Sequence, residues 1–211
     1  MKLALSALLA LALAGSAMAQ PPKAPPPKAP PFVAEKDPTK IQGGAYVVEP
    51  EHTRVMFAVS HKGFTIYYGQ FSKVSGTLML DTTNPAASKF DISVPVETVS
   101  TTNSVLDGEL RNKPWMDAPD FPTITFKSVS VKPTGPTTAD VTGDFTFHGV
   151  TKPLTLKVKF NAAGNDPQDK FYVAGFTVTG AIKRSDFGMG VAVPLIGDDV
   201  DLIISAAFKK P

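Results

Sequence analysis

The feature that most constrains this chain is an alternation of apolar and polar residues that returns in segment after segment after Tyr46. From Leu154 to Phe160, leucine, valine and phenylalanine occupy every second position, with threonine and lysine between them. Residues Leu202 to Phe208 repeat this pattern, although Ile203 interrupts the polar stripe. Because successive side chains of a β-strand point to opposite faces, the alternation predicts strands with one dry and one solvated face. Turn-forming clusters separate the runs, which is typical of an antiparallel meander.

One segment departs from the alternation. Residues Thr101 to Arg111 place Val105, Leu106 and Leu110 at helical spacing, with threonine or asparagine available as a cap and Pro114 as a stop. The sequence therefore predicts an all-β domain of about eight to ten strands with one short inserted helix. A closed barrel and a two-sheet sandwich both hide the apolar face of such a sheet, and periodicity does not separate them.

The N-terminus has the three parts of a secretory signal. Lys2 supplies the positive charge, residues 3–14 an apolar run, and Ala17-Met18-Ala19 a small-residue cleavage pattern. The apolar run is shorter than the ~20 residues that span a bilayer. We expect residues 1–19 to be a signal peptide that is removed on export, which places the mature protein in the periplasm.

A Pro-rich segment follows the signal. Eight of the 20 prolines lie between Gln20 and Lys40. Proline lacks the N–H that helices and sheets require, so residues 20–44 are expected to form a stiff, solvated linker before a domain at 45–211. The alternative is an arm that docks on a cell-wall or protein partner.

Charge and cysteine content exclude several classes of function. Lys2 and a surplus of two lysines in residues 20–44 account for more than the net charge of +2, so the domain itself is slightly acidic. No basic face for nucleic acid is indicated. The absence of cysteine excludes disulfides, thiolate catalysis, cysteine-based metal sites and the acceptor for a lipoprotein anchor.

The sequence contains few residues in catalytic or metal-binding patterns. His52 and His61 are separated by an odd number of positions, so they would face opposite sides of one strand, and His148 lies at a predicted turn. No zinc site is expected from this spacing. Arg184 and Asp186 lie two apart on one predicted strand. They are expected either to pair and hold the strand end, or to present Arg184 to the polar head of a ligand.

The sequence resembles the YceI-like family over residues 46–208. Five segments carry the resemblance in order: Tyr46–Gly63 (YVVEPEHTRVMFAVSHKG), Gly69–Asp81, Asp120–Ser128 (DFPTITFKS), Val141–Pro153 (VTGDFTFHGVTKP) and Arg184–Gly188 (RSDFG). The chain departs from the family on the predicted helix, where Leu106-Asp107-Gly108-Glu109-Leu110 stands in place of Arg-Asp-x-His-Leu. The arginine and the histidine of that motif are missing, so head-group preference is open.

The resemblance implies a lipocalin-like antiparallel β-barrel with an inserted helix, which holds an apolar polyisoprenoid chain and has no catalytic activity. It implies no metal and no cofactor other than the ligand itself, which could be an isoprenoid quinone. Transient membrane contact and a homodimer are compatible with it.

The candidate ligand-binding residues are the apolar stripes of the predicted strands together with Arg184: Phe57, Val59, Phe71, Leu78, Leu80, Ile124, Phe126, Phe145, Phe147, Leu154, Leu156, Phe176, Val178 and Arg184. Each apolar residue could equally fill a packed core, because small barrels are often solid. Two other functions stay open, namely a hydrolase or isomerase that uses His61, His148 or Asp186, and a structural or stress-related interaction module.

Overall fold

The computed structural model describes residues 33–211, so the predicted signal peptide and residues 20–32 of the predicted linker lie outside the described residues. The described chain forms ten strands and one α-helix. In chain order they are β1 Gly44–Val48, β2 Arg54–His61, β3 Thr65–Phe71, β4 Ser75–Leu80, β5 Lys89–Pro95, α1 Ser104–Arg111, β6 Thr123–Gly135, β7 Thr138–Phe147, β8 Val150–Asn165, β9 Tyr172–Lys183 and β10 Ile196–Lys209. Short 3₁₀ turns span Pro85–Ala87, Val96–Thr98 and Arg184–Phe187.

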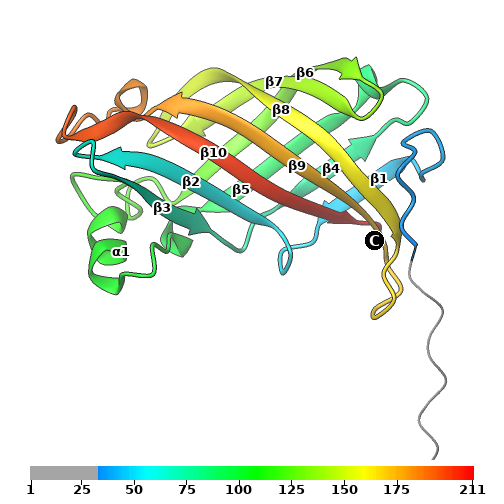
Figure 1. The fold of residues 1–211 in the computed structure, drawn as a ribbon, viewed down its shortest axis with the longest axis horizontal. Coiled ribbons are helices and arrows are strands. Elements are labelled where there is room, and N and C mark those ends of the chain that lie inside the picture. Colours follow the sequence, from blue (N-terminus) through cyan, green and yellow to red (C-terminus); the bar gives the residue numbers. More distant parts are fainter. Residues whose placement is uncertain (1–32) are drawn as a thin grey trace, which may run out of the picture. The chain divides into compact units, whose positions relative to one another are not determined.

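Eight of the strands close a barrel (Figure 1). Strands β4 to β10 pair in chain order, and β1 joins the two ends of this series by pairing with β4 on one side and with β10 on the other. At the closing seam Val47 faces Lys209, and Val48 faces Phe208. Every pairing is antiparallel. This confirms the predicted antiparallel barrel of about eight strands and excludes the sandwich.

Strands β2 and β3 extend the wall beside β10. β2 pairs with β10 from Ile196 to Ser205, along the part of that edge that β1 does not cover. β3 pairs with β2, and its other edge makes one isolated bridge, between Gln70 and Ser100. In Figure 1, α1 lies at one end of the barrel, and the C-terminus lies at the opposite end. We call these the helix end and the C-terminal end.

The predicted helix is confirmed. The side-chain oxygen of Asn103 accepts hydrogen bonds from the backbone N–H groups of Val105 and Leu106, at 3.1 and 3.3 Å, which caps the start of α1. Arg111 ends the helix, three residues before Pro114. No helix among residues 33–211 is long and apolar enough to cross a membrane.

The last part of the predicted linker, residues 33–44, packs on the barrel, where the backbone of Glu35 exchanges two hydrogen bonds with Ala163, at 2.7 and 2.8 Å. Ile41 is buried in the hydrophobic core, and Gly44 already belongs to β1. The composition of this segment does not reveal these contacts, because its partners on β8 and β9 lie more than a hundred residues away in the sequence.

Several large inward side chains lie over glycines on neighbouring strands. Phe57 on β2 covers Gly69 on β3, Phe126 covers Gly143, and Leu156 covers Gly180. A Cβ added at Gly69 would lie 2.2 Å from the tip of the Phe57 ring, which is far inside van der Waals contact. The missing side chains therefore provide room for the rings inside a narrow barrel.

Substitution Gly69→Ala should lower the free energy of unfolding by about 1–3 kcal/mol, because the new methyl group must displace the Phe57 ring. Equilibrium unfolding in urea measures this loss. The matched control is Gly108→Ala in α1, where an added Cβ meets no atom within 4 Å. That change should stabilise the protein by roughly 0.8–1 kcal/mol, as expected when alanine replaces glycine in a helix. A G69A protein as stable as the unmodified chain would contradict this packing.

Candidate functional site

The barrel encloses an apolar cavity of about 220 Å³. Side chains from all ten strands except β4 line it, together with residues in and after α1 and in the segment between β9 and β10. Thr53, Thr125 and Arg184 are the polar members of the lining. The cavity exceeds the roughly 150 Å³ of an engineered protein cavity that binds benzene, so it can hold an apolar ligand of at least that size.

The inward side chains show that this lumen is partly hollow. Val55, Val59 and Ile204 point into the cavity, yet each is only half-buried. In a close-packed barrel, inward residues at mid-strand would be fully enclosed by their neighbours. Their incomplete burial agrees with open space beside them in the lumen.

Most of the predicted ligand-binding residues line this cavity. The structure brings together Phe57, Val59, Phe71, Ile124, Phe126, Phe145, Phe147, Leu154, Leu156, Phe176, Val178 and Arg184. The two on β4 do not belong to it. Leu78 is completely buried and lines neither this cavity nor a second one of about 170 Å³ at the C-terminal end, which Leu80 lines.

Sequence reasoning missed a large part of the lining. Phe90, Ile92 and Val94 alternate with polar residues in β5, so the period-two pattern could have found them. The inward residues of β10, such as Leu202 and Phe208, carried the same signal.

Residues outside the strands carried no such signal. Leu110, Trp115 and Met116 line the cavity at the helix end, and Trp115 is the single tryptophan of the chain. Nothing in the spacing of these residues indicated that the segment after α1 folds over the barrel.

Arg184 is not paired with Asp186, and the predicted strand position of both residues is wrong. They lie in the 3₁₀ turn after β9. The buried Arg184 guanidinium donates hydrogen bonds to the backbone carbonyls of Met189, Ile196 and Gly197, and it lies 5.8 Å from the Trp115 ring centroid.

These bonds define the role of Arg184. Burial lowers the pKa of Arg184, and the nearby carboxylate of Asp198 acts in the opposite direction. The side chain holds the segment between β9 and β10 against the barrel, and its donors are used by the protein itself.

The residues proposed for an enzymatic alternative have structural partners. His148 lies in the turn between β7 and β8, where its Nδ1 is 3.0 Å from the carbonyl oxygen of Phe187 and its ring packs on Phe121. Asp186 forms an ion pair with Lys152 at 2.8 Å. His61 lies at the end of β2, beside Tyr67.

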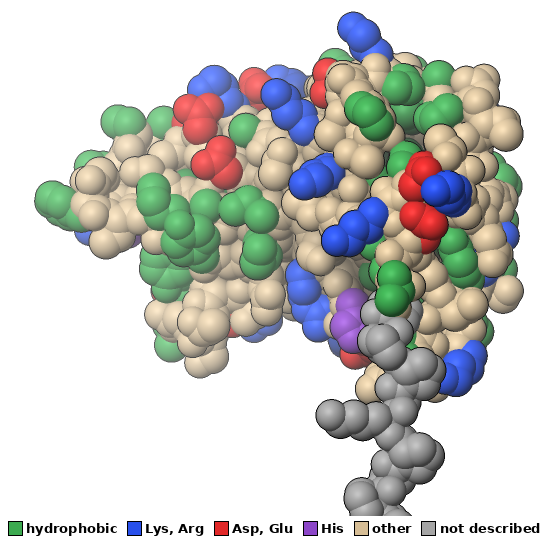
Figure 2. Space-filling view, turned by 45° about the vertical axis from the view of Figure 1, so that its right-hand side comes forward, with side chains coloured by type: hydrophobic (Ala, Val, Ile, Leu, Met, Phe, Trp, Pro, Cys, Tyr) green, Lys and Arg blue, Asp and Glu red, His purple; other side chains and the backbone are tan. Residues whose placement is uncertain are grey.

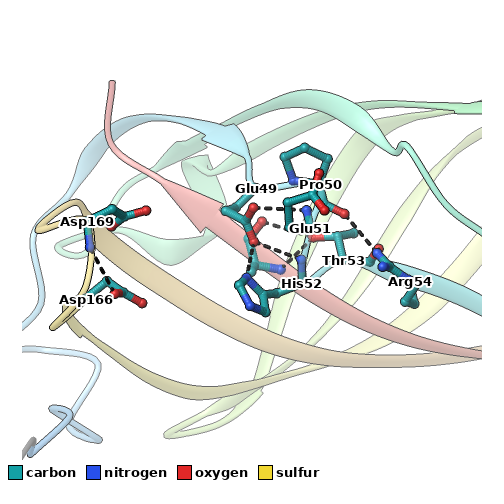
Figure 3. Close-up of polar contacts among 9 residues, drawn as sticks. Glu49, Pro50, Glu51, His52, Thr53, Arg54, Asp166 and Asp169 are labelled. Carbon is teal, nitrogen blue, oxygen red and sulfur yellow. Dashed lines mark hydrogen bonds and ion pairs between the residues drawn. The ribbon is translucent and has the colours of Figure 1, made fainter.

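His52 belongs to the turn between β1 and β2, shown in Figure 3. Its Nδ1 lies 2.6 Å from the carboxylate of Glu49, which also accepts backbone hydrogen bonds from Glu51 and His52. Burial would raise the pKa of Glu49, but these hydrogen bonds outweigh it and lower that pKa. The cluster therefore fastens a turn beside the barrel seam.

The lining offers no group for acid–base or metal chemistry. Among the lining residues of the larger cavity, all within the described range 33–211, there is no carboxylate and no imidazole. No group of three or more histidine, aspartate or glutamate residues in that range could hold a metal ion. Every buried side-chain nitrogen and oxygen there has a hydrogen-bond partner. The cavity can enclose hydrocarbon but presents no free polar anchor.

Comparison of the sequence with known proteins identifies relatives over most of the domain. Residues 46–208 match the model of the YceI-like domain. The chain is 37% identical over 168 residues to a UPF0312 protein of Pseudomonas syringae pv. tomato, covering 78% of this chain and 87% of the relative. It is 38% identical over 157 residues to protein YceI of Escherichia coli, covering 74% and 81%.

Solved structures share the fold. BcnA of Burkholderia cenocepacia superposes with a TM-score of 0.69 at 22% identity, covering 76% of this chain and 98% of BcnA. A domain from Saccharophagus degradans, described as polyisoprenoid-binding, superposes with a TM-score of 0.58 at 14% identity, covering 81% and 100%. From the family match and the identities to its relatives, this chain belongs to the YceI-like domain family.

Proposed function

We propose that this protein binds and carries an apolar lipid of the polyisoprenoid type, held in the barrel lumen. The observation that carries the proposal is the cavity of about 220 Å³ with an almost entirely apolar lining. The ligand is a polyisoprenoid or the side chain of an isoprenoid quinone. The polyisoprenoid-binding domain of Saccharophagus degradans, which shares the fold, supports this ligand class.

The energetics of such binding are favourable without any polar contact. Burial of apolar carbon contributes about 0.8 kcal/mol per CH₂ group, so ten enclosed carbons contribute about 8 kcal/mol. That equals the free energy of micromolar binding, about 8 kcal/mol. Each further carbon offsets the loss of translational and conformational freedom. A binding protein of this kind needs neither a catalytic group nor a cofactor.

The absence of a free polar anchor in the lumen also favours hydrocarbon over a charged head group. The guanidinium of Arg184 is engaged by three backbone carbonyls, so it is not available to a phosphate or carboxylate inside the barrel. An unpaired charge in this cavity would carry a large desolvation penalty. The polar head of the ligand therefore stays outside the lumen.

We propose the periplasm as the location. The support is the pattern of residues 1–19, with Lys2, an apolar run and Ala17-Met18-Ala19. A carrier of apolar lipid is useful in an aqueous compartment, where the free lipid is insoluble. The homodimer expected from the resemblance stays a prediction.

Transient contact with a bilayer is part of the proposal, and the helix end is suited to it. Phe64 at the turn between β2 and β3 is 87% exposed, and Leu195 is 62% exposed. The backbone N–H of Lys62 donates to the carbonyl of Leu195 at 2.6 Å, so the two apolar tips lie together. Met189 and Ile196, on either side of the segment that carries Leu195, line the cavity. The tips are thus adjacent to one end of the lumen.

The outer face of β2 and β3 extends these tips. Met56, Ile66 and Tyr68 are exposed there, and Met56 pairs with the exposed Ile203 on β10. Figure 2 shows hydrophobic side chains gathered in the left part of the molecule. Contiguous exposed apolar surface is typical of membrane or protein contacts.

The first test of carriage is the lipid content of the protein. Protein purified from its own periplasm should release a prenyl lipid on organic extraction, identified by mass spectrometry. Substitution Val59→Trp fills the lumen from β2 and should remove most of this lipid. Met56→Trp on the same strand points outward and serves as the matched control. Absence of prenyl lipid from both the unmodified protein and M56W would count against the proposal.

The second test concerns the bilayer contact. Substitutions Phe64→Asp and Leu195→Asp should weaken association with vesicles on the order of ten- to hundredfold each, because burial of one such side chain contributes about 1.5–3 kcal/mol. Vesicle co-sedimentation measures the change. Val129→Asp alters an equally exposed apolar residue on β6 and should have little effect. Equal association of all three variants would rule out docking through these tips.

A further inference from the structure

We propose that an aromatic partition across the lumen sets the length of the prenyl chain that the barrel accepts. The inference rests on the proposed function and specifies its ligand further. The partition consists of Phe90 on β5, Phe176 on β9 and Phe208 on β10. It separates the larger cavity, at the helix end, from the second cavity, at the C-terminal end.

The two cavities meet at a small set of shared residues. Phe90, Val141, Val158 and Phe176 line both of them. Three of these side chains come from the neighbouring strands β7, β8 and β9, and Phe90 comes from β5, which β6 separates from β7. The cavities are therefore two compartments of one lumen, and the boundary between them is made of side chains.

Ring contacts hold the partition together. The centroid of Phe208 lies 6.3 Å from that of Phe90 and 5.9 Å from that of Phe176, and both contacts are edge-to-face. Phe176 in turn lies 5.7 Å from Phe160, which lines the second cavity. Strands β5 and β10 are not neighbours in the sheet, so the contact between Phe90 and Phe208 reaches across the inside of the barrel. Edge-to-face packing stabilises such a cluster beyond its buried area.

The N-terminal segment forms part of the wall of the second compartment. Pro38, Thr39 and Ile41 line it, and Ile41 is buried there. The hairpin between β6 and β7 lines another side through Pro133 and residues 135–139. A chain end that passed the partition would enter a pocket that these residues already line.

The volumes indicate what the partition does. The compartments measure about 220 and 170 Å³. Each is smaller than the roughly 300–1,000 Å³ of pockets that enclose drug-sized ligands, whereas the two joined would fall within that range. With the partition in place, only a short prenyl chain is enclosed completely. Each carbon that the lumen encloses raises the binding constant about fourfold, and a carbon of a longer chain that stays outside makes no such contribution.

The test compares two probes of different length, farnesol as the short chain and solanesol as the long one. Vesicles that contain one probe are incubated with purified protein, the protein is separated, and the extracted prenyl alcohol is quantified by mass spectrometry. The unmodified protein should extract farnesol in preference to solanesol by on the order of 100-fold or more, because many solanesol carbons find no place in the first compartment.

Substitution Phe176→Leu shortens a side chain that lines both compartments. It should raise extraction of solanesol relative to farnesol at least tenfold. Phe208→Leu makes the same change on β10. It tests the partition independently if the first variant does not fold. Phe187→Leu is the matched control, because Phe187 is a buried phenylalanine that lines neither cavity and contacts Phe145 and Phe147 away from the partition. F187L should leave the ratio of the two probes unchanged.

The outcomes separate this inference from the proposed function. If the ratio rises in F176L or F208L but not in F187L, the partition sets chain length. Equal extraction of both probes by the unmodified protein would overturn the partition but not the carriage of prenyl lipid. An unchanged ratio in F176L and F208L, with both proteins folded by circular dichroism, would also overturn it. If no protein extracts either probe, the proposed function fails together with the inference.

Discussion

The structure depends on the way the edges of β10 are paired. One edge pairs with β9 over nearly the full length of β10, while the other is divided between β2 and β1. This division closes the ring at Val48 and Phe208 and satisfies the backbone groups that an open sheet would expose. It also fixes which side chains face inward, because register and face are linked in a strand. The lumen and its two compartments follow from that closure.

A closed ring of eight strands has little interior space, and the inward residues divide it. Where a large side chain lies over a glycine, as Phe57 does over Gly69, the wall itself makes room for the ring. Where Phe90, Phe176 and Phe208 meet, the space is filled and the lumen is interrupted. Because no buried polar group in the described residues lacks a partner, recognition inside such a lumen rests on shape and length.

The sequence predicted the residues that line the cavity well in the regular strands and poorly elsewhere. The alternation in β6, β7 and β8 placed residues such as Phe126 and Leu156 correctly in the lumen. It could not place Trp115, because the segment after α1 has no periodicity and reaches the cavity only through the fold. Arg184 was expected either to pair with Asp186 or to meet a head group. Instead it binds three backbone carbonyls, including that of Gly197, which is 13 positions away.

The sequence alone determined the strand pattern, the single helix with its Asn103 cap and the inward face of most strands, because each depends on residues close together in the chain. Tertiary structure decided that the sheet closes into a barrel, that residues 33–44 pack on it and that aromatic rings divide the lumen. Contacts between distant residues create these features, as in the pairing of Glu35 with Ala163 and the meeting of Phe90 with Phe208. Local sequence patterns do not predict such contacts, because the residues that make them come together only when the ring closes.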